Sequence, residues 1–591
     1  MALEGMEFTT KSYLDQKPGT SGLRKKVSVF EQENYIANFV QSTFNALRLL
    51  NSFPEVLVVG GDGRYYMKEA IQIILRVAMA NGVQSVWVGH KGLLSTPAVS
   101  TVIRRRSGGF KAQGAFILTA SHNPGGPDAD FGIKYNTANG GPAPEKVTEV
   151  IYNETLKIST LYLNSSLPEV DLTRIGVQTY DHFTVEVISS VEDYISYMKE
   201  IFDFDAIGSF LSRPDFTIHL DCLHGASGPY VQEIFHTCLG VPLASLHHTT
   251  PLSDFGGYHP DPNLTYAHNL VQVMGLLPNG SIDRSRAGEQ VPSFGAAFDG
   301  DADRNMILGS RFFVNPSDSL AILVANAEVI PFFRKAGGLS SVARSMPTSC
   351  AVDRVAQERN LRCFEVPTGW KFFGNLMDSK TVFGGEDYNP FICGEESFGT
   401  GSNHIREKDG VWTCLFWLSL LASKNDPGVN PSRSLVGVQS IVEQHWALYG
   451  LNYYTRYDYE NVSVDSANTV MENILSKLPE EIPCLDGKRC CIVDSFEYCD
   501  PIDGSITSKQ GVRVVFEDNS RFVLRLSSTG TSGATIRLYL EKYVGPAFVT
   551  DNLRKGTLPP SSEGLRELIQ ISLDVSKIPE ATGRDAPTVI T

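Results

Sequence analysis

Short apolar runs and amphipathic segments alternate along the first part of the chain. Val56–Val59 is an uninterrupted apolar run, Gly60–Arg64 is a glycine-rich turn, and Met67–Ala80 has apolar residues three and four positions apart. A second apolar run, Val86–Val88, follows. The pattern predicts a strand, a helix with one buried face and a further strand, which together form a βαβ unit. The glycine-rich turn is a weak phosphate-loop signal, and a plain tight turn is the favoured interpretation.

Predicted strands and helices continue to alternate further along the chain. Ala115–Leu118 is a short apolar run that predicts a buried strand, and Thr217–Asp221 and Gly295–Phe298 are also expected to be strands. A third α/β unit is expected over residues 316–425, with a helix over Ser319–Val329. The first three quarters of the chain therefore predict three successive α/β units, although periodicity alone cannot establish that they are copies of one design.

The last part of the chain has a different pattern. Val512–Phe516, Arg521–Leu526 and Thr535–Leu540 are closely spaced strands, and the third alternates apolar and polar residues. A small antiparallel sheet with helices is expected here, after a linker of polar residues, glycine and proline at Ser423–Ser434. The predicted domains are 1–192, 193–315, 316–425 and 435–591.

Composition narrows the class of protein. The 591 residues are 42% apolar and 20% charged with a net charge of −15, and nothing in the sequence resembles a basic stripe, which argues against a nucleic-acid surface. The basic cluster Arg104–Arg106 is interpreted as a solvated helix end. Ten cysteines without a C-x-x-C pair and no secretory signal predict a cytoplasmic protein with reduced thiols. Val411–Ala422, the longest apolar segment, is about half the ~20 residues of a membrane span and predicts a buried helix.

Ser121 follows the predicted strand Ala115–Leu118 in the segment T-A-S-H-N-P-G-G at 119–126. Ligands of open α/β sheets bind at such strand ends. A hydrolytic triad is disfavoured, because a serine cannot generally place its hydroxyl on the imidazole of the next residue, His122, and the G-x-S-x-G elbow is absent. A bare serine in a turn proves little, so its role depends on cooperating residues.

Three alternating carboxylates, Asp299, Asp301 and Asp303, follow the strand Gly295–Phe298. Acids this close repel one another unless a cation lies among them, so a divalent site with oxygen ligands is favoured over a solvated acidic turn. The spacing excludes an EF-hand, because Arg304 stands where a calcium loop needs glycine. Three carboxylates leave Mg²⁺ short of ligands, and a phosphate oxygen is the usual supplement.

Two further loops extend this chemistry. Glu395 and Ser397 lie between glycines and suit hydrogen bonds to sugar hydroxyls, and His404, Arg406 and Lys408 follow as possible cations or acid–base groups. The segment R-L-S-S-T-G-T at 525–531, with Arg537 on the next strand, has the hydroxyls and arginines of a phosphate clamp. A serine, a metal, a polyol site and two phosphate sites together predict phosphoryl transfer on a sugar.

The motifs resemble those of the eukaryotic phosphoglucomutases of the α-D-phosphohexomutase superfamily nearly end to end. They are K-P-G-T-S-G-L-R at 17–24, T-A-S-H-N-P-G-G at 119–126, the loop 299–304, P-T-G-W-K-F-F-G-N-L-M-D at 367–378, G-E-E-S-F-G at 394–399, H-I-R-E-K-D-G at 404–410 and A-P-T-V-I-T at 586–591. The resemblance implies three related α/β domains with mixed sheets and a smaller α+β C-terminal domain, heart-shaped around a central cleft.

The resemblance also implies the site. Ser121 would be a phosphoserine, and Asp299, Asp301 and Asp303 would bind Mg²⁺ with one phosphoserine oxygen. Arg24, His122, Lys134 and Lys408 would line the reaction centre, with His122 and Lys408 as candidates for proton transfer. The implied substrate-binding residues are Thr20, Arg304, Thr368, Gly369, Glu395, Ser397, Arg525, Ser527, Thr529, Gly530 and Arg537. The implied reaction interconverts glucose 1-phosphate and glucose 6-phosphate through glucose 1,6-bisphosphate.

Some positions depart from the family pattern, and alternatives stay open. Ala302 and Ser528 stand where the family has glycine, and Leu277–Ser293 and Thr381–Ile392 look like insertions. None of these changes removes a functional side chain. The alternatives are a non-catalytic scaffold or secretion-associated protein resembling aciculin or parafusin, and a mutase for another phosphohexose. The expected partner is a phosphorylated hexose, with no nucleic acid and no membrane span, and the expected state is a monomer or weak dimer.

Overall fold

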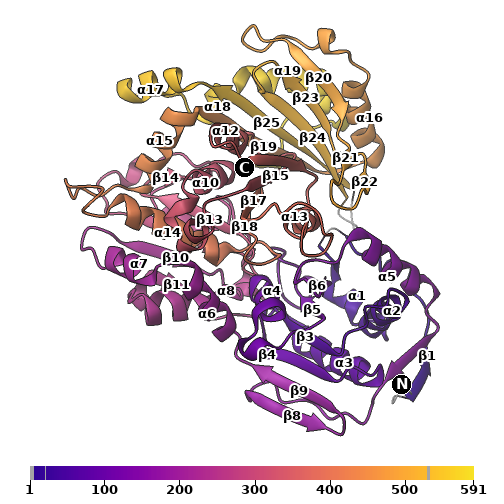
Figure 1. Cartoon of the computed structure of the whole chain (residues 1–591). Helices are drawn as coiled ribbons and strands as arrows, with labels where there is room; N and C mark the ends of the chain where they lie inside the picture. The colour runs from indigo at the N-terminus through magenta and orange to yellow at the C-terminus, as the bar shows by residue number, and fades with distance from the viewer. Residues whose placement is uncertain (1–5, 20, 529–532) are drawn as a thin grey trace.

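The computed structural model describes residues 6–19, 21–528 and 533–591 and contains four main sheets (Figure 1). The first sheet has seven strands in the order β2-β6-β5-β3-β4-β9-β8. Their bounds are Leu23–Lys26 (β2), Asp130–Thr137 (β6), Gly114–Leu118 (β5), Val56–Gly61 (β3), Ser85–Leu93 (β4), Phe183–Ile188 (β9) and Gly176–Tyr180 (β8). The main helices beside it are α2 (Tyr35–Leu49), α3 (Met67–Ala80), α4 (Thr96–Arg105) and α5 (Glu145–Lys157). The predicted βαβ unit is therefore confirmed as β3, α3 and β4.

The second sheet has five strands in the order β11-β10-β12-β13-β14. They are Leu246–His247 (β11), Ile218–Asp221 (β10), Phe294–Phe298 (β12), Asn305–Gly309 (β13) and Phe312–Phe313 (β14), with helices α6 (Glu192–Ile201), α7 (Phe204–Leu211), α8 (Ser227–Val231) and α9 (His268–Val273). The segment Leu277–Ser293 contains a short 3₁₀ turn, Arg284–Arg286, and an isolated bridge from Ile282 to Leu276, and it is mostly exposed. It covers little of the core.

The third sheet has four strands in the order β16-β15-β17-β18. They are Arg362–Val366 (β16), Ser341–Ser345 (β15), Phe391–Glu395 (β17) and Gly399–Ser402 (β18), with helices α10 (Pro316–Ala325), α11 (Pro331–Lys335), α12 (Ala351–Glu358), α13 (Trp370–Met377) and α14 (Gly410–Lys424). The helix expected over Ser319–Val329 starts earlier, because Asn315 caps it and Pro316 occupies its first turn. It ends at Ala325, and a 3₁₀ turn continues to Val329.

The C-terminal sheet is antiparallel, as predicted, with the order β20-β23-β24-β25-β19-β26. Its strands are Cys490–Ser495 (β20), Val512–Phe516 (β23), Arg521–Ser528 (β24), Ala534–Val544 (β25), Leu451–Val462 (β19) and Val589–Ile590 (β26). The helices are α15 (Val438–Tyr449), α16 (Val464–Leu475), α17 (Pro546–Lys555), α18 (Ser561–Gly564), α19 (Arg566–Ser576) and α20 (Ile578–Thr582).

The first three sheets share one arrangement of four strands. A central strand (β3, β10 or β15) pairs in parallel with one strand on each side, and the next strand in sequence returns antiparallel. Each sheet thus contains one hairpin at the same place: β5 with β6, β12 with β13, and β17 with β18. This common topology supports three related α/β units, a relation that the sequence pattern left open.

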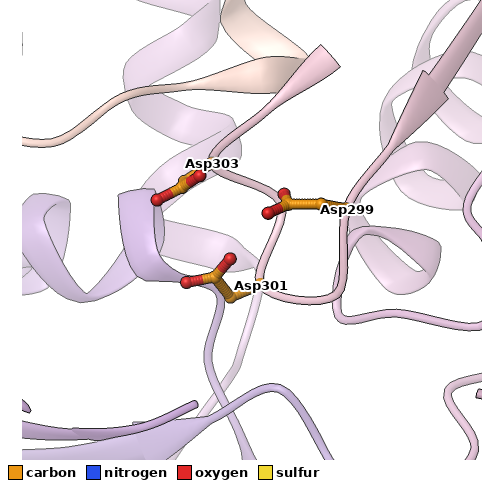
Figure 2. Close-up of side chains that lie close together, drawn as sticks. All are labelled: Asp299, Asp301 and Asp303. Carbon is orange, nitrogen blue, oxygen red and sulfur yellow. The ribbon is translucent and has the colours of Figure 1, made fainter. Parts of the chain in front are cut away.

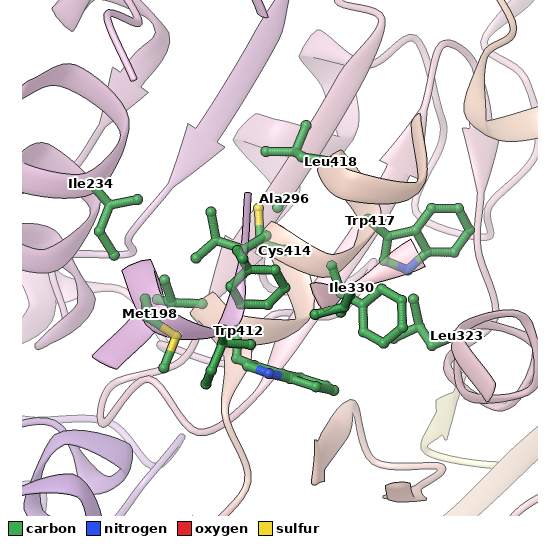
Figure 3. Close-up of a cluster of buried hydrophobic side chains, with 14 of the residues drawn as sticks. Met198, Ile234, Ala296, Leu323, Ile330, Trp412, Cys414, Trp417 and Leu418 are labelled. Atoms are coloured by element: carbon green, nitrogen blue, oxygen red, sulfur yellow. The ribbon is translucent and has the colours of Figure 1, made fainter. Parts of the chain in front are cut away.

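Helix α14 lies in the largest hydrophobic core, and this position explains why the helix is apolar on all sides. Figure 3 shows Trp412, Cys414, Trp417 and Leu418 of this helix among side chains of other elements, including Met198 of α6. Both tryptophans are fully buried, so an all-round apolar helix is what this position requires. The prediction of a buried helix is confirmed, and within the described residues no helix combines the length and hydropathy of a membrane span.

Candidate active site

The predicted chemistry falls on the three equivalent hairpin loops. Residues 119–129 connect β5 to β6, residues 299–304 connect β12 to β13, and residues 396–398 connect β17 to β18. The first loop carries Ser121, the second carries the aspartates, and the third follows Glu395. Because the hairpins occupy the same place in each unit, three stretches that are far apart in sequence can face one another.

Ser121 lies at the meeting point of the first two loops. Its side chain is buried, and its hydroxyl donates to Asp299 Oδ2 at 3.0 Å. The residue has a φ of 54°, a left-handed conformation that is uncommon for serine and frequent at functional sites. Gly300 lies opposite, and a Cβ there would come within 2.6 Å of the Ser121 carbonyl oxygen. A glycine in the aspartate loop therefore permits the close approach of the serine.

His122 corrects one step of the sequence argument. Ser121 Oγ lies 3.3 Å from His122 Nδ1, a contact that was not expected between adjacent residues. The left-handed backbone at Ser121 folds the loop back and makes it possible. Burial and the charges of Arg304 and Arg24 hold the pKa of His122 well below its usual value. In a hydrolytic triad a carboxylate orients the histidine. The charges that shift the pKa of His122 are positive, so its surroundings are not those of a triad histidine.

A buried ion pair holds the serine loop in place. Arg64 Nε contacts Asp62 Oδ2 at 2.8 Å with both side chains fully buried, and Arg64 Nη2 donates to the Ser121 carbonyl oxygen at 2.9 Å. Thr119 Oγ1 donates to Asp62 at 2.6 Å and accepts from the Ser121 N–H at 2.7 Å. The turn Gly60–Arg64 is therefore more than a plain tight turn, because it fixes the backbone of the serine.

The three aspartates form the second loop. Figure 2 shows their carboxylates turned toward one another, and one oxygen of each lies within 4.8 Å of the others. All three side chains are buried. Thr96 Oγ1 donates to Asp301 Oδ2 at 2.6 Å, and the Arg304 N–H donates to Asp299 Oδ1 at 2.9 Å. Thr96 belongs to the first α/β unit and Arg304 to the second, so hydrogen bonds from both units hold the loop in place.

The aspartate group fits a divalent cation. Asp301 Oδ1 is buried and, among the described residues, has no hydrogen-bond partner. Burial and the neighbouring charges of Asp301 and Asp303 raise the pKa of Asp299 well above its usual value. Burial acts the same way on Asp301, but Lys134 and the Thr96 hydroxyl outweigh it and lower its pKa to about 2. Such repulsion is what a bound cation relieves, so these residues can hold a metal ion.

Ala302 lies in this loop with a φ of 64° and is fully buried. A left-handed backbone costs an alanine roughly 1–2 kcal/mol, and glycine avoids that cost while adding flexibility to the unfolded chain. We expect Ala302→Gly to raise the free energy of unfolding by about 0.5–1 kcal/mol, measured by urea denaturation. Ala78→Gly, inside α3, is the matched control and should lower it. A loss of stability in Ala302→Gly would contradict the inferred strain.

The third loop places Glu395 beside the segment 367–370. Glu395 Oε1 accepts from the Gly369 N–H at 2.9 Å, and burial raises its pKa. Gly369 has a φ of 132°, which only glycine adopts readily. Thr368 Oγ1 is buried and lacks a hydrogen-bond partner in the described part of the chain, and Ser397 is half-buried. The predicted polyol-binding residues Thr368, Gly369 and Glu395 therefore lie together.

Cationic side chains surround the first two loops. Lys408 Nζ lies 3.0 Å from Asp303 Oδ1, and Lys134 Nζ lies 3.2 Å from Glu407 Oε1. Arg304 lies 3.8 Å from Asp261. Burial lowers the pKa of Arg24, whose guanidinium feels the charges of Asp301 and Arg304. The predicted cations Arg24, Lys134, Arg304 and Lys408 thus converge on the serine and the aspartates.

Two charged residues near the third loop have structural partners instead. His404 and Arg406 are buried, and Arg406 Nη2 contacts Asp378 Oδ1 at 2.7 Å. His404 joins Ser402 at 2.7 Å and Asp409 at 3.1 Å. The group resembles a hydrolytic triad in composition, but all three side chains are sealed in the core. Their hydrogen bonds and ion pair give both side chains structural roles, and the suggestion that they also serve the reaction stays a prediction.

The C-terminal sheet carries the predicted clamp arginines. Arg525 on β24 and Arg537 on β25 are directly opposite in register, and Ser527 is half-buried on β24. Burial lowers the pKa of Arg525, but Tyr539 and the charges of Glu396 and Glu395 raise it overall, so this arginine borders the third loop. Thr20, Thr529 and Gly530 lie outside the described residues.

Sequence motifs missed a third arginine on this sheet. Asp458 on β19 is opposite Arg537, and its carboxylate lies 3.8 Å from Arg537 and 3.0 Å from Arg456. Arg456 also lines a pocket together with Glu396 and Phe398 of the third loop. Strand pairing brings together a row of four charged residues, Arg525, Arg537, Asp458 and Arg456. The only sign of this row in the sequence is the alternating pattern T-R-Y-D-Y at 455–459.

Comparisons with known proteins agree with this geometry. The chain is 55% identical, over 98% of its length, to the probable cytoplasmic phosphoglucomutase 1 of Arabidopsis thaliana, and covers 97% of that protein. It matches the phosphoglucomutase/phosphomannomutase alpha/beta/alpha domains I, II and III over residues 15–161, 192–311 and 316–437. The chain belongs to the phosphoglucomutase/phosphomannomutase family. The C-terminal domain of phosphoglucomutase-1 matches residues 451–588.

Other phosphoglucomutases and solved structures extend the comparison. The cytoplasmic phosphoglucomutase of Populus tremula is also 55% identical over 98% of both chains. The open-form crystal structure of the exocytosis-sensitive phosphoprotein pp63/parafusin from Paramecium, itself described as a phosphoglucomutase, is 46% identical with 99% coverage of both chains and a TM-score of 0.87. A phosphomannomutase from Thermus thermophilus, at 21% identity and a TM-score of 0.62, shares the fold. The predicted family and fold class are confirmed.

Proposed function

We propose that this protein is a cytoplasmic phosphoglucomutase that interconverts glucose 1-phosphate and glucose 6-phosphate through glucose 1,6-bisphosphate. The single observation that carries the proposal is the contact between Ser121 Oγ and Asp299 Oδ2, which joins a candidate phosphoryl carrier to a candidate metal loop. Phosphoglucomutase relatives that match nearly end to end support it.

In this proposal Asp299, Asp301 and Asp303 hold Mg²⁺ with an oxygen of phosphorylated Ser121. When bound, the ion supplies positive charge that offsets the charge of the phosphoserine, about −1.5 to −2. Arg24, Lys134 and Arg304 add fixed positive charge around the phosphoryl group. In phosphoryl transfer most of the catalysis is positioning and charge stabilisation, and a buried, cation-lined serine provides both.

The reaction moves one phosphoryl group in each direction. A sugar hydroxyl attacks phosphorus, the bond from phosphorus to Ser121 Oγ breaks, and the proton of the sugar hydroxyl passes to an enzyme group. His122 is favoured for accepting the Ser121 proton when the serine oxygen attacks the bisphosphate, because its Nδ1 is 3.3 Å from Oγ and its lowered pKa keeps the imidazole neutral, whereas Lys408 Nζ is paired with Asp303. The bisphosphate then turns over, and its other phosphate returns to Ser121.

The remaining loops bind the part of the substrate that does not react. Glu395 and Ser397, with Thr368 and Gly369, would hold the sugar hydroxyls. Arg525, Ser527, Thr529, Gly530 and Arg537 would clamp the second phosphate, and Thr20 would also bind the substrate. We add Arg456 to this clamp, held by Asp458.

A chelator should abolish turnover. In a coupled assay that detects glucose 6-phosphate, started with a trace of glucose 1,6-bisphosphate, we expect EDTA to reduce activity to background and Mg²⁺ to restore it. The reason is that three buried carboxylates cannot remain together near a phosphoserine without a cation.

The same assay separates the alternatives. Absence of metal-dependent turnover on any hexose phosphate would favour a non-catalytic scaffold and contradict the proposal. A value of kcat/KM on mannose 1-phosphate comparable to that on glucose 1-phosphate would defeat the preference for glucose, while the mutase mechanism would stand.

Removing the third clamp arginine should weaken substrate binding. We expect Arg456→Gln to raise KM for glucose 1-phosphate roughly tenfold or more while kcat changes little, since contacts to the non-reacting phosphate act in the ground and transition states alike. Lys542→Gln, on the same sheet and paired with exposed Asp486, is the control. An unchanged KM in Arg456→Gln would remove this residue from the clamp.

A further inference from the structure

Histidines gather on the second α/β unit. Seven of the twelve histidines of the chain lie between His219 and His268. Four of them, His219, His224, His247 and His248, sit on or just beyond β10 and β11, at one edge of the second sheet (Figure 1), and each is half-buried. We call these four residues the histidine patch. The mutase reaction uses none of them.

Two members of the patch are oriented alike by their hydrogen bonds. His224 Nδ1 lies 2.9 Å from the Thr250 carbonyl oxygen, and His248 Nδ1 lies 2.8 Å from Asp221 Oδ1. Both partners only accept, so each Nδ1 carries a proton and each neutral ring keeps the lone pair of Nε2. The two ring centroids are 4.7 Å apart. Nε2 of both His224 and His248 is therefore the ring nitrogen that is available to a ligand.

Asp221 connects the two halves of the patch. The residue is buried, and its Oδ2 has no hydrogen-bond partner within the described residues. Its bond to His248 raises the pKa of that imidazole. His219 and His247 stack with centroids 3.7 Å apart. Burial and the nearby His247 lower the pKa of His219 to about 4, while Asp221 opposes the shift. The carboxylate therefore bonds one imidazole of the patch and acts electrostatically on a second.

We propose that His224 and His248 form a binding site for a transition-metal ion such as Zn²⁺ or Cu²⁺, separate from the aspartate loop. Imidazole is a preferred ligand of these ions, whereas Mg²⁺ prefers oxygen. Ligating histidines usually donate their other ring N–H to a carboxylate or carbonyl oxygen, as both of these do. Among described residues only the aspartates bring three ligand atoms within 4.8 Å, so the histidine site has two protein ligands, and water completes it.

The test is a Zn²⁺ titration of the full chain by calorimetry in saturating Mg²⁺, with Cu²⁺ electron paramagnetic resonance as a second probe. The unaltered protein should bind Zn²⁺ with Mg²⁺ present and give nitrogen couplings with Cu²⁺. The variant His224→Ala/His248→Ala should lose this binding at least tenfold and lose the two-nitrogen signal. Asp221→Asn should weaken binding about 10–100-fold, because it alters the group that orients His248.

Two control variants distinguish this site from other histidines and from the aspartate loop. His90→Ala removes a histidine elsewhere that also bonds a carbonyl oxygen, and it should leave Zn²⁺ affinity unchanged. Asp301→Asn disables the aspartate loop, and the Cu²⁺ nitrogen couplings should persist in it. Unchanged affinity in His224→Ala/His248→Ala, or loss of those couplings in Asp301→Asn, would overturn the proposal. Mutase activity is not the readout, so failure here is separate from failure of the proposed function.

Discussion

Ser121→Ala is expected to lower turnover of glucose 1-phosphate by roughly 10⁴-fold or more, because it removes the proposed covalent phosphoryl carrier. The side chain is small and buried, and it donates one hydrogen bond, to Asp299. Stability should therefore change by only about 1 kcal/mol. The measurements are the coupled mutase rate and the intact mass of the purified protein.

The mass measurement identifies the carrier directly. The unaltered protein should contain a fraction heavier by one phosphate that maps to Ser121, and Ser121→Ala should lack it. Ser107→Ala, which changes an exposed serine, should keep both the phosphate and the rate. A wild-type rate in Ser121→Ala would show that the proposed mechanism is wrong.

Breaking the buried pair of Asp62 and Arg64 should cost both stability and activity. Both side chains have no exposed surface, so either Asp62→Asn or Arg64→Met leaves one partner uncompensated. We expect each to lower the free energy of unfolding by about 3–5 kcal/mol, measured by urea denaturation. Activity should fall as well, because Arg64 also donates to the Ser121 carbonyl oxygen.

The double variant separates the two effects. Asp62→Asn/Arg64→Met removes both charges, so part of the stability should return, whereas activity should stay low because the serine backbone has lost its donor. Arg213→Met, which breaks an exposed pair with Asp215, should change stability by less than about 1 kcal/mol. Recovery of wild-type activity in the double variant would show that the pair does not position the serine.

The sequence predicted those parts of the site that are contiguous. Asp299, Asp301 and Asp303 stand in one loop, so their spacing was enough to predict a cation site. Ser121 stands at the end of an obvious strand, but its role was predicted only from the neighbouring motifs and the family resemblance. Hydrophobic periodicity also placed α3 and the C-terminal strands, and the long apolar segment 411–422 placed α14. The boundaries of α10 were missed, since the cap at Asn315 and Pro316 outweighed the apolar pattern.

The missed features depend on contacts between distant residues or on local backbone conformation. Arg64 reaches a carbonyl oxygen 57 residues away, and Arg456 joins the clamp only through the pairing of β19 with β25. The contact between Ser121 and His122 required a left-handed φ that residue type alone does not reveal. Proximity in sequence also did not reveal that His404 bonds Ser402 and Asp409, because these contacts depend on the fold.

The three hairpin loops have a consequence for how the protein acquires activity. Each loop is shaped by strand pairing inside its own unit, but Ser121 meets Asp299 178 residues later and Thr96 meets Asp301 205 residues later. Strand pairing within a unit can precede docking, whereas these bonds form only once the first two units have docked. Catalytic competence is therefore a late product of folding, and a chain with native secondary structure but undocked units would be inert.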